Sequence, residues 1–288
     1  MSNEPGRRAG DEPDAAVIDD PLDGDALSRH LATTWLGRAR HIHLAVSGST
    51  NDVASAEART GAAQGLVVTA DAQTSGRGRL GRVWHSPAGA NIYVSILLRP
   101  RRPAAEIPPV TLLAGGAVAA ALGALGFDAR VKWPNDVLLA TGGHVRKVAG
   151  ILTEAQTEGD RVGHVVVGIG LNVHTRSFPD DLADKATSLA LAGGRGLMRA
   201  RVLAHVLGTF EAAYDRFQVQ GAAAAIELWE AHASLGVRCR ARVGGATGGT
   251  TVEGITEGVA ADGALELRDD DGVVHRIVAG EVVPVAVA

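Results

Sequence analysis

Residues 73–90 are the part of the chain that most restricts its possible folds. The stretch is polar, carries three arginines, is interrupted by glycines and shows no hydrophobic period. Apolar segments typical of strands flank it at 65–69 and 91–98. Long loops inside compact domains usually serve a function or are disordered. The fold must therefore hold a long, basic loop between two strands.

Hydrophobic periodicity predicts helices and strands on both sides of this loop. We expect helices at 26–36, at 49–59 with Ser49 as the N-cap, at 110–125 and across 199–233. We expect strands at 41–46, 65–69, 91–98, 129–132, 136–139, 147–156 and 162–173. From Gly236 onward, short β segments at 237–243, 251–259, 264–268 and 273–279 are separated by Gly and Asp turns. The pattern indicates an α+β domain followed by a small β-barrel.

Composition narrows the class of protein. Aromatic residues make up only 3% of the chain, so its core must consist of Ala, Val, Leu and Ile. A net charge of −4 argues against a general nucleic-acid-binding surface. Cys239 is the single cysteine, which excludes a disulfide framework and fits a reducing cytoplasm. The N-terminus lacks a signal-peptide core, and no apolar run approaches the roughly 20 residues of a membrane span.

One motif in the loop is misleading. Residues 76–81 (GRGRLG) fit the dinucleotide pattern G-x-G-x-x-G, but a strand-like segment follows them and no helix does. The position about 20 residues further on is Arg101, where the motif requires an acid. A P-loop and a zinc-type Cys/His spacing are also absent from the sequence. His41 and His43 share a strand face, but two ligands do not make a metal site.

The few lysines of the chain point to an anion site. All of the 28 basic residues except Lys132, Lys147 and Lys185 are arginine. A compact ammonium is not interchangeable with a guanidinium where it must reach a phosphate or carboxylate. The glycines of the loop allow close backbone approach, and its arginines supply forked donors. Together with Trp84 and Trp133, these groups predict an anion site beside an apolar surface of adenine size.

Five motifs in order give the chain a family resemblance. They are 49–51 (STN), 73–82 (QTSGRGRLGR), 132–136 (KWPND), 147–152 (KVAGIL) and 168–172 (GIGLN). This set resembles that of the biotin protein ligases. The resemblance implies an α+β, mixed-sheet catalytic domain of the class II synthetase-like, biotin/lipoate ligase type, with a small SH3-like C-terminal β-barrel. The expected division is a disordered tail at 1–24, a catalytic domain at 25–234 and the SH3-like domain at 235–288.

The same resemblance implies an ATP-dependent reaction in two steps. Biotin and ATP form biotinyl-5′-AMP and pyrophosphate, and the biotinyl group then passes to a lysine of a biotin carboxyl carrier domain. The catalytic candidates are Lys147, Arg79 and Arg82. The candidates for biotin binding are Ser49, Thr50, Asn51, Gln73, Gly76, Arg77, Gly78, Arg79, Lys147 and Gly150. The candidates for nucleotide binding are Arg79, Arg82, Trp84, Asn135, Asp136, Lys147, Gly170 and Asn172. The protein itself is expected to provide no metal site, because Mg²⁺ would be bound mainly through ATP phosphates.

Some details stay open at this point. Lys132 is either a site residue or a structural one. At 284–285 the chain has Pro-Val where some family members carry an arginine near the nucleotide, which leaves a contact between the C-terminal domain and ATP open. We expect the segment 74–90 to be mobile without ligand and to order over biotin and the adenylate, which would keep water from the anhydride.

Three alternative functions differ from this prediction in testable ways. A lipoate or octanoate ligase shares the catalytic architecture, but the arginine-rich loop and the KWPND motif favour biotin. A ligase that also acts as a DNA-binding repressor needs a further domain ahead of Ser47, for which too few ordered residues are expected. A pure biotin-binding protein would not explain the phosphate-type residues. The expected partner is thus the carrier domain of acyl-CoA carboxylases, without sequence-specific DNA or a membrane, and the expected state is a monomer or weak homodimer.

Overall fold

The computed structural model describes residues 20–243 and 250–285. The predicted tail comprises residues 1–24, of which residues 1–19 lie outside these ranges. Its last part is folded, so the prediction is wrong for residues 20–24. The reason is that Leu22 joins the hydrophobic core and the buried Asp20 carboxylate accepts hydrogen bonds from the Arg199 backbone. Helix α1 (Gly24–Ser28) follows at once, capped by the Asp23 side chain.

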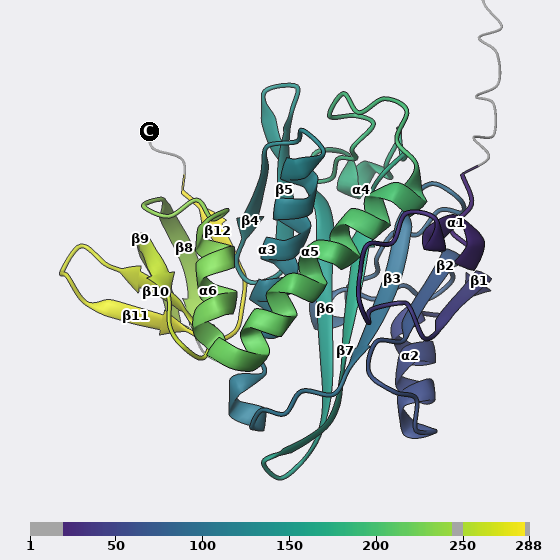
Figure 1. The fold of residues 1–288 in the computed structure, drawn as a ribbon. Helices are drawn as coiled ribbons and strands as arrows, with labels where there is room; N and C mark the ends of the chain where they lie inside the picture. Colours follow the sequence, from purple (N-terminus) through teal and green to yellow (C-terminus); the bar gives the residue numbers. More distant parts are fainter. Residues whose placement is uncertain (1–19, 244–249, 286–288) are drawn as a thin grey trace, which may run out of the picture.

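A seven-stranded mixed sheet forms the centre of the larger domain (Figure 1). In spatial order its strands are β1 (His41–Ser47), β2 (Val67–Gln73), β3 (Ile92–Leu98), β7 (Arg161–Leu171), β6 (His144–Glu158), β5 (Asp136–Thr141) and β4 (Ala129–Lys132). The pair β1 and β2 is parallel, and the other neighbours are antiparallel. The predicted mixed sheet and all seven of its predicted strands are therefore confirmed, with shifts of a few residues at their ends.

Helices cover both faces of this sheet. Helix α2 (Thr50–Arg59) buries Ala54 and Ala58 against one face. The other face packs against α3 (Val110–Ala124), α5 (Arg199–Gln220) and α6 (Ala222–Glu230). The remaining helical turns are η1 (Arg79–Gly81), η2 (Ala104–Glu106) and α4 (Asp180–Ala183). The central strands β2, β3 and β7 thus place buried residues in both apolar layers, such as Val67 in one and Val68 in the other.

One helical stretch, residues 104–124, is long and apolar enough to cross a membrane by composition. Its most apolar window is 72% buried inside the protein. Figure 1 shows α3 packed behind α5, between that helix and the sheet. An apolar helix covered in this way is typical of the core of a globular domain.

The predicted helix at 26–36 is wrong beyond Ser28. The backbone N–H groups of Thr34, Trp35 and Leu36 donate instead to the carboxylate of Glu211 on α5, at 2.6 to 3.0 Å. Three consecutive N–H groups that point at one carboxylate cannot also donate along a helix. The leucine spacing that suggested a helix therefore reflects burial of an irregular segment.

A second, five-stranded antiparallel sheet forms the C-terminal part, in the order β11-β10-β9-β8-β12. Its strands are β8 (Arg238–Val243), β9 (Thr250–Val259), β10 (Leu265–Arg268), β11 (Val274–Ile277) and β12 (Val282–Pro284). Four of them were predicted, and β12 was not. The sheet is consistent with the predicted SH3-like fold. Trp133 Nε1 donates to the Gly263 carbonyl at 2.9 Å, so the KWPND segment connects the two parts of the chain.

Candidate functional site

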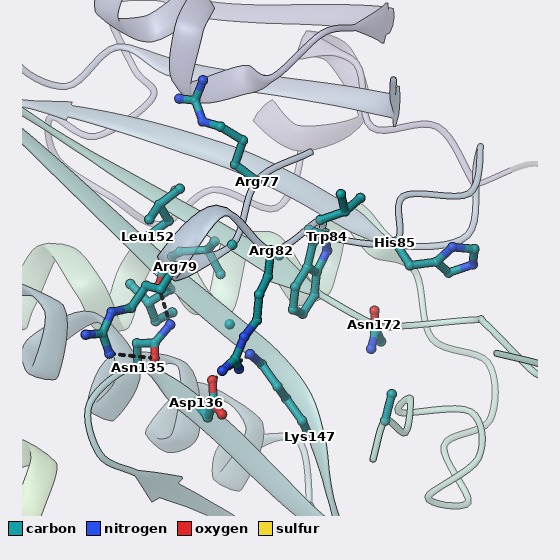
Figure 2. A pocket seen from close by; sticks show the side chains of 18 of the residues that line it. Arg77, Arg79, Arg82, Trp84, His85, Asn135, Asp136, Lys147, Leu152 and Asn172 are labelled. Carbon is teal, nitrogen blue, oxygen red and sulfur yellow. Dashed lines mark hydrogen bonds and ion pairs between the residues drawn. The ribbon is translucent and has the colours of Figure 1, made fainter. Parts of the chain in front are cut away.

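A cavity of about 510 Å³ opens on the sheet where the five motifs meet. Its wall takes residues from β6 and β7, from the start of α2, from the loop after β2 and from the C-terminal part. The predicted site residues that line it are Ser49, Thr50, Asn51, Gln73, Arg77, Gly78, Arg79, Arg82, Trp84, Asn135, Asp136, Lys147, Gly150, Gly170 and Asn172. Lys132 and Trp133 line it as well. Figure 2 shows Arg82 and Lys147 approaching Asp136 from different elements, whereas Arg77 points away from them.

Lys147 lies in a narrow slot of the cavity. Its Nζ lies 2.5 Å from Asp136 Oδ1 and 5.2 Å from the centre of the Trp84 ring. A side chain at Gly150 would clash, because its Cβ would lie 2.9 Å from Trp84 Cζ3 and 3.0 Å from Lys147 Cε and Nζ. At Gly170 a Cβ would lie only 2.4 Å from the Trp84 indole. The two glycines therefore let Trp84 and Lys147 lie against the sheet.

The loop after β2 contains a small hairpin, residues 76–84, which we call the arginine hairpin. The backbone N–H of Trp84 donates to the Gly76 carbonyl at 2.9 Å, and the backbone N–H of Gly78 donates to the Arg82 carbonyl at 2.7 Å. At the tip, Leu80 takes a left-handed backbone conformation (φ 58°) and is 74% exposed. The long loop is thus confirmed, but it has local structure that its sequence period did not predict.

Each arginine of the arginine hairpin has different partners. Arg77 pairs with Asp52 and Glu154, and Arg82 Nη2 lies 2.6 Å from Glu281 Oε2 on the C-terminal part. Arg79 Nη1 instead donates to the amide oxygen of Asn135 at 3.3 Å. Within residues 20–243 and 250–285, Arg79 alone of the three has no carboxylate within ion-pair distance. It is therefore the hairpin arginine most available to an incoming anion.

These surroundings shift the pKa values of the arginines in opposite directions. Burial lowers the pKa of Arg79, and the nearby Arg82 charge acts in the same direction, although Asp136 and Glu281 oppose it. The hydrogen bond and charge of Glu281 raise the pKa of Arg82. Burial alone would lower the pKa of Arg77, but hydrogen bonds and charge from its carboxylate partners raise it. All three guanidinium groups stay cationic at neutral pH. An added anion would give Arg79 the largest electrostatic stabilisation, because it has no carboxylate partner among the described residues.

A chain of polar side chains forms the other end of the cavity. The Thr50 N–H donates to Gln73 Oε1 at 2.9 Å, and Gln73 Nε2 donates to Ser86 Oγ at 3.2 Å. Ser95 Oγ lies 2.8 Å from Thr50 Oγ1 and 2.6 Å from Asn51 Oδ1. The Gln73 amide orientation is fixed by these contacts, and its second N–H can be offered to a ligand.

Two asparagine amides border the part of the cavity where nucleotide binding was predicted. Asn135 Nδ2 donates to the Ile151 carbonyl at 2.8 Å, which leaves its oxygen for Arg79. Asn172 Nδ2 donates to the Thr187 carbonyl at 3.0 Å. The buried Trp84 Nε1 has no hydrogen-bond partner among the described residues. An orphaned donor beside a cavity is a natural position for a ligand acceptor.

The structure differs from the sequence predictions at a few positions. Gly76 does not line the cavity, and its role is steric, because a Cβ there would lie 2.7 Å from Ser86 Oγ. The cavity-lining residues that lie outside the five motifs include Phe178, Leu182, Lys185 and Glu281. The GEV stretch at 280–282 was a usable signal for Glu281. Lys185 was noted only as one of the three lysines of the chain; its place at the cavity could not be predicted, because its segment reaches the site by pairing with Lys147 of β6.

Comparisons with known proteins find two family models and several relatives that match most of the chain. The model of the Biotin/lipoate A/B protein ligase family matches residues 44–172, and that of the Biotin protein ligase C terminal domain matches residues 234–283. Over 273 residues the chain is 33% identical to the Biotin--[acetyl-CoA-carboxylase] ligase of Mycobacterium tuberculosis, covering 91% of this chain and 96% of that one. It is 42% identical over 236 residues to the Bifunctional ligase/repressor BirA of Bacillus spizizenii, covering 81% and 70%. The biotin protein ligase from Aquifex aeolicus, solved with biotin and ATP, aligns with a TM-score of 0.69 at 29% identity, covering 84% and 97%.

Proposed function

The chain belongs to the biotin protein ligase family, and from this premise we propose how its cavity binds and joins its two substrates. It is an ATP-dependent ligase that takes biotin and ATP. The biotin carboxylate attacks the α-phosphorus of ATP, a P–O bond forms, and the bond to pyrophosphate breaks. The product is biotinyl-5′-AMP, a mixed anhydride whose acyl carbon is open to an amine.

The first step requires two negative groups to meet. Lys147 is proposed to lie between the biotin carboxylate and the α-phosphate. This role is supported by its slot between Asp136 and Trp84, which holds the ammonium in one position. A preorganised positive group that meets the charge of the transition state is among the strongest catalytic devices. Arg79 and Arg82 are proposed to hold phosphate oxygens on the other side.

Biotin is proposed to lie along the polar end of the cavity, with its ureido ring near Thr50, Gln73 and the Arg77 backbone. The fixed Gln73 amide supports this position. Ser49, Gly78 and Gly150 would border the same subsite. The adenine would lie near Trp84 and Asn172, where the orphaned Nε1 offers a donor. Asn135, Asp136 and Gly170 would complete the nucleotide side, and the role of Lys132 stays open.

Mg²⁺ is the usual ion for ATP use, and it would supply charge neutralisation on the phosphates. The described ranges contain no group of three or more His, Cys, Asp or Glu side chains that could hold a metal. Of the carboxylates that line the cavity, Asp136 and Glu281 are paired with Lys147 and Arg82, and Asp184 is exposed and lies 3.8 Å from Arg146. The residues present therefore fit an ion that is held by phosphate oxygens and water.

The second step transfers the biotinyl group to a lysine amine, which forms an amide and releases AMP. We propose a biotin carboxyl carrier domain as the acceptor. A cytoplasmic location is supported by the single cysteine, Cys239, which is buried and free. The oligomeric state, a monomer or weak homodimer, stays a prediction.

The observation that carries the proposal is the meeting of Lys147, Arg79 and the polar chain at Gln73 in one cavity. The test is pyrophosphate release with Mg²⁺-ATP and one of three acids: biotin, lipoate or octanoate. We expect release with biotin and little with the other two. Faster release with lipoate or octanoate would favour the alternative ligase, and no release with any acid would refute the proposed function.

A further inference from the structure

The Arg77 side chain turns away from the other cationic groups of the site. Its Nη1 lies 2.7 Å from Asp52 Oδ1, and its Nη2 lies 3.1 Å from both oxygens of Glu154. Figure 2 shows Arg77 pointing away from Arg79 and Lys147. Asp52 belongs to α2 and Glu154 to β6, so this trio ties the arginine hairpin to both elements. We call Asp52, Arg77 and Glu154 the acidic clamp.

Glu154 also makes a contact that leads toward the biotin subsite. Its Oε2 accepts a hydrogen bond from Asn51 Nδ2 at 2.6 Å. Asn51 is 3% exposed, and its amide nitrogen also donates to the Leu152 carbonyl at 3.3 Å. Its oxygen accepts from Ser95 Oγ at 2.6 Å. The protein itself therefore occupies both the nitrogen and the oxygen of the Asn51 amide.

This arrangement changes the role expected for Asn51. An amide whose groups are all engaged by the protein holds its neighbours in position, and it has little left to offer a ligand. The neighbour on α2 is Thr50, which contacts Ser95 and Gln73. The contacts thus run from Glu154 through Asn51 and Ser95 to the side chains proposed to read the ureido ring.

We infer that Glu154 is a positioning residue for biotin. One of its carboxylate oxygens fixes the Asn51 amide, and both hold Arg77 of the arginine hairpin. A carboxylate is suited to this task because it accepts on both oxygens, whereas a glutamine presents one oxygen and one NH₂ group. Glu154 does not line the cavity, so it acts only through the residues that do. The inference rests on the proposed function, because that function supplies biotin as the ligand.

The test compares variants of the full chain by biotin-dependent pyrophosphate release. Glu154→Gln should raise KM for biotin about tenfold, because a charged hydrogen bond to a buried amide is lost and a donor faces a donor. Asp52→Asn should raise it about twofold at most, because the Asp52 side chain is exposed and such pairs contribute little. For both variants, kcat and KM for ATP should stay within about twofold of the unaltered protein, since the carboxylate does not touch the reacting atoms.

Glu158→Gln is the matched control, because Glu158 is an exposed glutamate at the far end of the same strand. It should leave KM for biotin unchanged. Arg77→Ala gives an independent reading if Glu154→Gln does not fold, because it leaves the Glu154 contact with Asn51 in place. Arg77→Ala should raise KM for biotin severalfold in the normal background and by less in the Glu154→Gln background.

The inference is overturned if Glu154→Gln changes KM for biotin by less than twofold. An equal rise of KM for ATP would also overturn it, because a general loss of structure does not discriminate between substrates. Additive effects of Arg77→Ala and Glu154→Gln would show that the two residues do not act through one contact. Failure of the unaltered protein to release pyrophosphate with biotin would refute the proposed function instead.

Discussion

Lys147→Ala is the change with the largest expected effect on the first chemical step. Lys147 is the only lysine of the described chain that lies within ion-pair distance of a carboxylate, and its partner Asp136 faces the same cavity. Removing a preorganised charge of this kind costs roughly 2.7–4 kcal/mol of transition-state stabilisation, a loss of about 10² to 10³ in rate. The uncompensated Asp136 would in addition repel the incoming phosphates.

The structure also predicts that Lys147→Arg will rescue little. The ammonium lies 2.5 Å from Asp136 Oδ1 and 5.2 Å from the centre of the Trp84 ring, and a Cβ at Gly150 would already lie 3.0 Å from it. A planar guanidinium is larger and would displace the indole. Transfer from supplied biotinyl-5′-AMP should be slowed less than adenylate formation, because the carboxylate and the α-phosphate are already joined in that compound.

Biotin-dependent pyrophosphate release, followed at saturating ATP and biotin, measures the first step. Lys147→Ala combined with Asp136→Asn separates the two contributions: a partial recovery over Lys147→Ala alone identifies repulsion from Asp136. Pyrophosphate release by Lys147→Ala at a rate close to normal would refute the reasoning for Lys147.

Three further predictions concern the arginine hairpin and the fold. Arg79→Ala should let free biotinyl-5′-AMP escape, which would be measured as adenylate in solution and as unselective labelling of added lysines; complete retention would contradict it. Backbone hydrogen exchange of residues 76–82 should slow when biotin and ATP are added, whereas equally slow exchange without ligand would show a preformed hairpin. Glu211→Gln should lower the free energy of unfolding by about 1.5–3 kcal/mol in urea, because the carboxylate serves three backbone N–H groups. Burial alone would raise the pKa of Glu211, but the backbone hydrogen bonds outweigh it and lower the pKa. The contribution of Glu211 to stability should therefore be complete above its ordinary pKa of about 4.3 and be lost as the pH falls through the lowered value. A stability difference between Glu211→Gln and the unaltered protein that is unchanged at pH 3 would contradict this.

The sequence motifs identified many of the residues that line the cavity, and there is a physical reason for this. In the proposed function, groups such as Lys147, Arg79 and Gln73 contact substrate atoms, which would restrict their residue types and spacing. Gly150 and Gly170 follow from the same restriction, because Trp84 leaves no space for a side chain at either position. Motifs of this kind report local chemistry, and the strand order then brings them together.

Contacts between distant segments were not predictable in this way. Glu281 reaches Arg82 from the last strands of the chain, and Glu154 reaches Arg77 from β6. Their identity as carboxylates is visible in the sequence, but their partners depend on the fold. The misassigned helix at 26–36 has the same origin, because the Glu211 carboxylate captures its backbone from α5.

The ion pairs of the arginine hairpin bear on its expected mobility. Arg77 and Arg82 are both paired with carboxylates, which reduces the mutual repulsion of the three hairpin arginines. The order of the loop without ligand stays a prediction. If the acidic clamp holds one end of the hairpin, ligand-dependent motion should be concentrated at its tip, near the strained Leu80.

A single-turnover labelling experiment tests the central claim most directly. The protein is mixed with biotin and ATP labelled at the α-phosphate, without an acceptor, and passed through a desalting column. The account predicts that label stays with the unaltered protein as biotinyl-5′-AMP, is strongly reduced in Lys147→Ala, and is released as AMP when a carrier domain with an unmodified lysine is added. Retained label that is still ATP, or AMP release without biotinylation of the carrier, would contradict it.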